Sequence, residues 1–166
     1  MDSQRLPITL QTPHVHLTKR TVWQLFGEGY KLTPAAPGDM PGRFLARERV
    51  RVTAPEGTER ELPVIGPAAA GSRVYLPGAE GAVTLRGPAG EVILPVTPHR
   101  PHIHMPPEDA STLALLEGQE VTLATADGRR LEGVQVRVSH QYVTRIHLMA
   151  GENCPFTEED LFHVEK

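Results

Sequence analysis

Apolar and polar residues alternate along most of the chain, which is the pattern of strands with one buried face. Gly-, Pro- and Asp-rich turns separate these segments at short intervals, as in hairpins. The predicted strands are residues 8–11, 44–53, 60–65, 83–86, 91–94, 121–123, 131–138 and 142–149. The pattern therefore predicts a mainly β protein of barrel or sandwich type.

Helical periodicity is confined to two short segments. Thr18 is placed to cap a helix over residues 19–26, and Gly27 is placed to end it. A second helix is expected over residues 107–116. The many glycines and prolines, 15 and 16 of 166 residues, fit an architecture in which no helix is long.

The order of these elements occurs twice. His14-Val15-His16 and His102-Ile103-His104 each precede one of the predicted helices, at an offset of about 88 residues. This echo predicts an internal duplication, with two small β-barrel-like halves capped by short helices. The Pro-rich stretch 95–101 is the expected boundary, giving residues 1–95 as the N-terminal half and 96–166 as the C-terminal half.

Composition and charge narrow the function classes. The net charge of −3 argues against a general nucleic-acid binder, and an anionic ligand would need a local cluster of arginines. No apolar run is long enough for a membrane span, and no signal core precedes the first strand. A single cysteine, Cys154, excludes an internal disulfide framework and is interpreted as a free thiol. A cytoplasmic protein is expected.

The histidine pairs carry the candidate chemistry. Residues i and i+2 of a strand project from one face, so both imidazoles of a pair can converge on one zinc ion. A single pair is weak evidence, because strand histidines are more often held by ordinary hydrogen bonds, but two pairs at matching places favour metal binding. His147, in the last predicted strand, offers a third nitrogen, and three histidines plus water form an open, catalytic type of zinc site. The candidate ligands are His14, His16, His102, His104 and His147.

Six motifs in order give the chain a family resemblance. They are residues 13–18 (PHVHLT), 25–33 (LFGEGYKLT), 41–44 (PGRF), 64–68 (VIGPA), 102–110 (HIHMPPEDA) and 134–139 (VQVRVS). In these segments the chain resembles the phosphate propanoyltransferases, or PduL-type phosphotransacylases. The resemblance implies a pair of small β-barrels with a two-zinc site and transfer of an acyl group between coenzyme A and inorganic phosphate. It also implies that His14 and His16 hold one zinc, and that His102, His104 and His147 hold the other.

The chain departs from the family pattern at two positions of the implied site. Ala69 stands where the family has an arginine that contacts phosphate or the carbonyl, and Tyr75 where it has a zinc-binding glutamate. Arg73 is the first candidate to replace the arginine as a catalytic residue, and Arg100 the second. Glu48 or Glu80 are the candidates for the lost carboxylate.

The leading functional prediction is a zinc-dependent phosphotransacylase with acyl-CoA and phosphate as substrates. The alternative is a divergent zinc-binding paralogue without transferase activity, and a metal-dependent hydrolase of a thioester or phosphate is a third interpretation. Neither nucleic acid nor a membrane is an expected partner, while self-association and acyl-chain preference stay open. Residues ahead of His14 resemble a strand and turn rather than the amphipathic helix that targets family members to microcompartments, so a freely cytosolic protein is expected.

Overall fold

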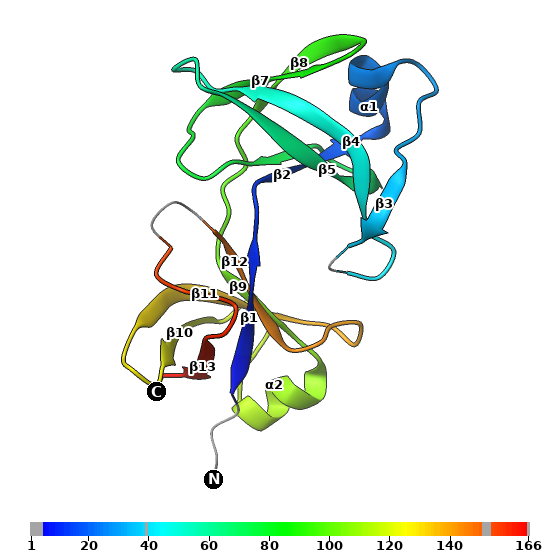
Figure 1. The fold of residues 1–166 in the computed structure, drawn as a ribbon. Helices are drawn as coiled ribbons and strands as arrows, with labels where there is room; N and C mark the ends of the chain where they lie inside the picture. The colour runs from blue at the N-terminus through cyan, green and yellow to red at the C-terminus, as the bar shows by residue number, and fades with distance from the viewer. Residues whose placement is uncertain (1–4, 39, 151–153, 166) are drawn as a thin grey trace. The chain divides into compact units, whose positions relative to one another are not determined.

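The computed structural model describes residues 5–38, 40–150 and 154–165. In these residues the chain forms thirteen strands and two short helices (Figure 1). In chain order they are β1 (Leu6–Gln11), β2 (His14–Thr18), α1 (Lys19–Phe26), β3 (Pro34–Pro37), β4 (Phe44–Thr53), β5 (Glu59–Ala69), β6 (Arg73–Tyr75), β7 (Ala82–Gly87), β8 (Gly90–Pro95), β9 (His102–Met105), α2 (Pro107–Leu113), β10 (Glu120–Thr125), β11 (Arg130–Val138), β12 (Arg145–Met149) and β13 (Leu161–Val164). The mainly β fold with two helix-bearing repeats, predicted from the sequence, is confirmed.

The chain divides into two compact units. Pro13–Pro98 form the first, here called the N-unit, and the second, the C-unit, combines Met1–Thr12 with His99–Lys166. The sequence placed residues 1–95 together, whereas the structure groups β1 with the C-unit. Leu6 and Ile8 of β1 are fully buried in the C-unit core, and alternation along a strand does not reveal which sheet the strand joins.

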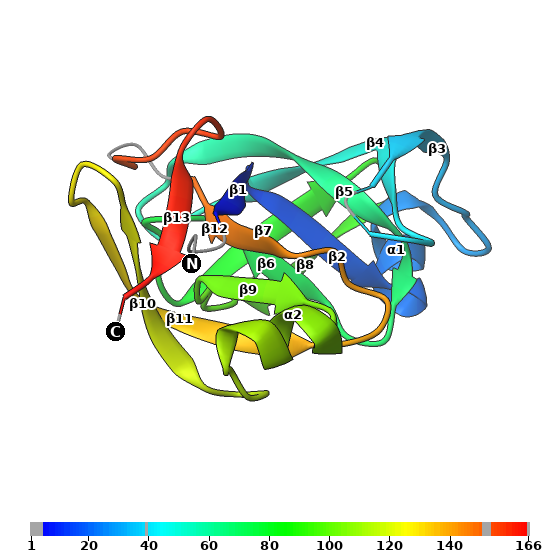
Figure 2. The same ribbon diagram turned by 90° about the horizontal axis from the view of Figure 1, so that it is seen from below.

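The C-unit is a closed barrel in which the strands follow the order β1-β12-β9-β11-β10-β13. In Figure 1 the blue β1 runs beside the orange β12, which pairs in turn with the green β9. The short β13 closes the ring by pairing with both β10 and β1. Helix α2 follows β9 and lies beside β9 and β11 in the view of Figure 2, and its Ala110 joins the core. The buried core residues are Leu6, Ile8, Ile103, Met105, Ala110, Leu115, Val121, Leu123, Val134, Val136, Ile146, Phe156 and Phe162.

The N-unit is a seven-stranded sheet in the order β6-β2-β5-β4-β7-β8, with β3 added on β4. Its two ends meet, because the Thr97 N–H, just beyond β8, donates to the Val74 carbonyl oxygen of β6 at 2.8 Å. The Val74 N–H in turn donates to Thr97 Oγ1 at 3.0 Å. These bonds give the sheet a barrel-like closure around its own core. That core consists of Val15, Leu17, Val22, Leu25, Ala46, Val50, Val52, Leu62, Val64, Val74, Leu76, Val83 and Leu85.

Helix α1 has the predicted bounds, and Thr18 Oγ1 caps it by accepting the Thr21 N–H at 3.2 Å. The helix packs so closely on the β7–β8 turn that a Cβ at Gly87 would lie 2.4 Å from the Leu25 carbonyl oxygen. Helix α2 ends earlier than predicted, because Ala114 adopts left-handed backbone angles (φ 57°, ψ 43°). No helix in the described part of the chain is both long and apolar enough to cross a membrane.

Strand β6, which has three residues and pairs with β2, was not predicted from the sequence. Strands β3 and β13 were not predicted either. These two have only four residues each, and β3 begins and ends with proline, which weakens any strand signal. Their positions come from pairing with β4 and with β10 and β1, respectively. Strands this short depend on their neighbours rather than on their own alternation.

Candidate metal centre

Three histidines converge on one side of the C-unit barrel. In the antiparallel pair of β9 and β12, His102 lies opposite His147 and Ile103 opposite Ile146. The two isoleucines are fully buried in the core, so the histidines point from the other side of the strands. Ring centroids lie 4.7 Å apart for His102 and His104, 5.2 Å for His102 and His147, and 4.4 Å for His104 and His147. The register therefore brings together the three residues predicted from the sequence as one site.

The surroundings of these imidazoles fix part of their orientation. His102 Nδ1 lies 3.1 Å from the Arg100 carbonyl oxygen, which only accepts, so Nδ1 carries a proton and Nε2 has the lone pair in the neutral imidazole. His147 Nδ1 lies 3.4 Å from the side-chain amide of Gln11, which belongs to β1. Tyr142 stacks on His104 with centroids 4.0 Å apart and rings nearly parallel. Only 8% of His104 and 5% of His147 is exposed.

The N-unit repeats this register with different residues. In the antiparallel pair of β2 and β6, His14 lies opposite Tyr75 and His16 opposite Arg73. The rings of His14 and His16 have centroids 5.0 Å apart, and Tyr75 lies 5.1 Å from His14 and 5.9 Å from His16. Tyr75 thus holds the place in the N-unit that His147 holds in the C-unit.

The C-unit cluster suits zinc by its donor set. Three imidazoles bonded to one zinc at about 2.0–2.1 Å per nitrogen place their ring centroids roughly 5 Å apart. The measured separations of 4.4–5.2 Å match that spacing. As the side chains stand in the described residues, no group of three or more His, Cys, Asp or Glu is already arranged to hold a metal ion. Binding would therefore require rotation of the imidazole rings, within a cluster that already has the right spacing.

The candidate replacements for the lost arginine and glutamate lie in different places. Arg73 is exposed on β6, and its Nη1 donates to the Tyr75 hydroxyl at 3.5 Å, so it belongs to the N-unit cluster. Arg100 instead lies on the surface, 3.6 Å from Glu120. Ala69 ends β5, paired with Thr18 beyond His16.

Within the described residues, the two carboxylate candidates, Glu48 and Glu80, lie outside the histidine clusters. Glu48 accepts the Thr33 N–H at 2.6 Å and the Tyr30 hydroxyl at 2.9 Å. Partial burial opposes ionisation of Glu48, but these hydrogen bonds outweigh it and lower the pKa of the carboxyl. The same carboxylate raises the pKa of the Tyr30 hydroxyl. Glu48 therefore anchors the segment before β4, and Glu80 is exposed.

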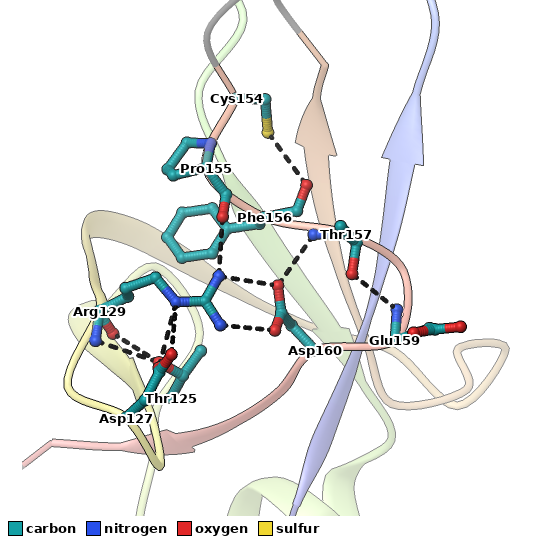
Figure 3. Close-up of polar contacts among 9 residues, drawn as sticks. All are labelled: Thr125, Asp127, Arg129, Cys154, Pro155, Phe156, Thr157, Glu159 and Asp160. Carbon is teal, nitrogen blue, oxygen red and sulfur yellow. Dashed lines mark hydrogen bonds and ion pairs between the residues drawn. The ribbon is translucent and has the colours of Figure 1, made fainter.

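Cys154 lies in the segment that an arginine fastens to the C-unit (Figure 3). Arg129 binds Asp160 at 2.7 Å, Asp127 at 3.0 Å and the Pro155 carbonyl oxygen at 2.7 Å. Hydrogen bonds from Thr125 and then Arg129 lower the pKa of Asp127, and that from Arg129 lowers the pKa of Asp160. The Cys154 thiol donates a hydrogen bond to the Phe156 carbonyl oxygen, with Sγ 3.7 Å from that oxygen.

Sequence reasoning missed three residues beside the C-unit histidines: Gln11, Tyr142 and Arg145. Arg145 lies opposite His104 in the β9–β12 register, as Arg73 lies opposite His16. Alternation could have found Arg145, because it is two residues before His147 on the same face. Gln11 and Tyr142 come from distant positions and carry no such signal.

Comparisons with known proteins agree with this duplicated architecture. The model of a family described as phosphate propanoyltransferase matches residues 7–82 and again 78–157. A phosphate propanoyltransferase from Leptotrichia buccalis is 33% identical over 178 residues, covering 92% of this chain and 84% of the relative. Phosphate propanoyltransferases of Clostridioides difficile and Priestia megaterium are both 31% identical, covering 81% and 90% of this chain and 76% and 80% of the relatives. With two family matches that together span most of its length, the chain belongs to the phosphate propanoyltransferase family.

Proposed function

We propose that the protein is a zinc-dependent phosphotransacylase, which converts acyl-CoA and inorganic phosphate into acyl phosphate and coenzyme A. The observation that carries the proposal is the convergence of His102, His104 and His147 in a chain of this family. The names of the relatives, phosphate propanoyltransferase, support a short acyl group as the substrate class.

His102, His104 and His147 would hold one zinc, and His14 and His16 a second. A bound zinc supplies Lewis acidity toward a carbonyl or phosphoryl oxygen. The Arg100 carbonyl keeps the proton of His102 on Nδ1, which leaves Nε2 as the nitrogen that would bind zinc. The Tyr142 ring stacks on His104 and shields one face of that imidazole. The chain's part in the reaction is thus to keep three imidazole donors at the spacing that one zinc requires.

In the reaction, a phosphate oxygen forms a bond to the thioester carbonyl carbon, and the carbon–sulfur bond breaks. The thiolate of coenzyme A leaves and takes the proton that hydrogen phosphate carried, so the products are acyl phosphate and free thiol. No protein nucleophile is needed. The site must bring two anions together, which requires positioning and neutralisation of charge.

Arg73 is the proposed catalytic arginine of the N-unit. It lies opposite His16 and contacts Tyr75, and its exposed guanidinium matches the two oxygens of a phosphate better than an ammonium group would. Arg73→Ala should lower kcat/KM for phosphate by at least about tenfold, while Arg73→Lys should lose less.

A coupled assay tests the proposed function. Purified zinc-loaded protein is mixed with propionyl-CoA or acetyl-CoA, with and without phosphate, and free thiol and acyl phosphate are both measured. Thiol release that requires phosphate and matches acyl phosphate one to one supports the transferase.

The other outcomes of that assay favour the rival functions. Thiol release without phosphate indicates a thioester hydrolase. No release by a folded, zinc-loaded protein would contradict the proposal and favour a zinc-binding paralogue, for which Ala69 and Tyr75 at the two departing positions would be the reason.

A further inference from the structure

We propose that Arg145 and Arg137, on either side of His104, bind the phosphoryl oxygens of a substrate. This inference deepens the proposed function and rests on it for the substrate class. Arg145 of β12 and Arg137 of β11 are both register partners of His104 on β9. Partners on neighbouring strands lie about 4.7–4.9 Å apart and project from one face, so the three side chains form a row across the sheet.

The two guanidinium groups of this row have neutral partners. Arg145 Nε donates to Thr9 Oγ1, and Arg137 Nη2 donates to Gln135 Oε1 at 3.3 Å. By contrast, Arg100, Arg129 and Arg130 of the same unit each lie within 3.6 Å of a carboxylate oxygen. Over residues 5–38, 40–150 and 154–165, neither Arg137 nor Arg145 forms an ion pair. Their charges are thus available to an anion.

The anchoring of Arg145 prepares it for a phosphate. The Thr9 hydroxyl accepts the hydrogen bond from Arg145 Nε, so the two Nη groups form the edge of the guanidinium that is available to a ligand. A guanidinium edge binds two oxygens of a phosphate side by side, and less mobility is lost on binding when the side chain is already held. Arg145 is only partly exposed, which weakens screening by solvent and salt.

The internal duplication gives a second reason to place an anion site on the sheet face that carries Arg137, His104 and Arg145. Arg73 and Arg145 are equivalent, since each lies opposite the second histidine of its pair. Arg137 has no cationic counterpart, because Ile65 is the residue beside His16 on β5. The C-unit therefore gathers two guanidinium groups around one histidine, and the N-unit one. In a chain of net charge −3, such a local cluster is what an anionic substrate requires.

Inorganic phosphate and the phosphates of coenzyme A share this chemistry, and the experiment separates them. Arg145→Gln, Arg145→Lys and Arg137→Gln are compared with wild type by calorimetric titration with phosphate, with coenzyme A and with dephospho-coenzyme A. Arg130→Gln is the matched control, because Arg130 lies on the same strand as Arg137 but is ion-paired with Glu165 at 2.7 Å. Zinc content and thermal unfolding are recorded for each variant.

We expect Arg145→Gln and Arg137→Gln each to weaken binding of one ligand about tenfold, with Arg145→Lys intermediate and Arg130→Gln within twofold of wild type. Weaker binding of phosphate by these variants shows that the two arginines contact inorganic phosphate, the nucleophile of the proposed reaction. Weaker binding of coenzyme A instead shows that the two arginines contact the acyl carrier. If the variants also bind dephospho-coenzyme A more weakly than wild type does, the contact is with the pyrophosphate.

Anion binding by Arg137 and Arg145 and acyl transfer are measured separately, so each can be contradicted without the other. If wild-type protein binds these anions through the two arginines but shows no acyl transfer, the anion site is supported and the proposed transferase activity is contradicted. Wild-type affinity for all three ligands in Arg137→Gln and in a folded Arg145 variant would overturn the inference, even if the transferase is active. Failure of the wild type to bind any of the ligands would overturn it as well.

Discussion

The two units share one strand register but carry different donors. His147 of the C-unit and Tyr75 of the N-unit each lie opposite the first histidine of a pair, while Arg145 and Arg73 each lie opposite the second. Ile146 and Val74, between them, are fully buried in their respective cores. The backbone and core of the repeat are thus retained where the residue opposite the first histidine, the proposed third zinc ligand of the C-unit, differs. A change of one donor alters metal preference without altering the fold.

The largest expected effect comes from removing the second histidine of each pair. His104→Ala should lower the zinc affinity of the C-unit by at least about 100-fold, since even loss of an outer hydrogen-bond partner costs about 10–100-fold. His16→Ala should cost less, because a phenol is a weaker third donor than an imidazole. Competition titration with a chromophoric chelator measures both. Full zinc occupancy in His104→Ala, or equal losses in the two variants, would contradict the difference between the units.

A second variant converts one unit toward the other. Tyr75→His places an imidazole where the C-unit has His147, and should tighten zinc binding by the N-unit about tenfold or more. Tyr75→Phe is the control, because it keeps the ring and lacks a donor. The measurement is zinc per chain at a fixed free zinc concentration. If Tyr75→His and Tyr75→Phe bind the same amount of zinc, then placing a histidine at the position equivalent to His147 is not sufficient to give the N-unit the zinc affinity of the C-unit.

The smallest expected effect concerns acid stability. The lowered pKa of Asp160 means that its ionised form stabilises the folded C-unit at pH values above its ordinary pKa of about 3.9. That contribution is lost as pH falls through the lowered pKa. Asp160→Asn should therefore reduce the midpoint of thermal unfolding slightly at pH 7 and leave it nearly unchanged near pH 2. An equal reduction at both pH values would show that packing, not charge, holds the segment of Figure 3.

Glu48 of the N-unit provides a comparison for that test. Its pKa is also lowered, so its contribution too is present at neutral pH and lost in acid. Its partners are the neutral Thr33 amide and Tyr30 hydroxyl rather than an arginine. Added salt should accordingly weaken the Asp160 contribution more than that of Glu48.

Much of each unit was predictable from local sequence. Alternation located β4, β5 and the later hairpins, and Thr18 with Gly27 fixed the bounds of α1. The pairing of strands was less accessible, because alternation gives the face of a residue and not its neighbour. Gln11 and His147, separated by 136 residues, meet only because β1 joins β12 in parallel. The equivalence of Tyr75 and His147 likewise required the register of two antiparallel pairs.

The two units differ in how they depend on chain order. The N-unit is contiguous, Pro13–Pro98, and Thr97 near its end bonds to β6 of the same unit. The C-unit barrel instead takes β1 from ahead of His14 and its other strands from beyond His99. During synthesis on a ribosome, β1 must therefore wait, unpaired, until β12 has emerged. Contacts between such distant segments slow folding and leave a strand edge exposed meanwhile. The N-unit can thus complete its sheet while the chain is still being made, whereas the C-unit barrel closes only after its last strand has been synthesised.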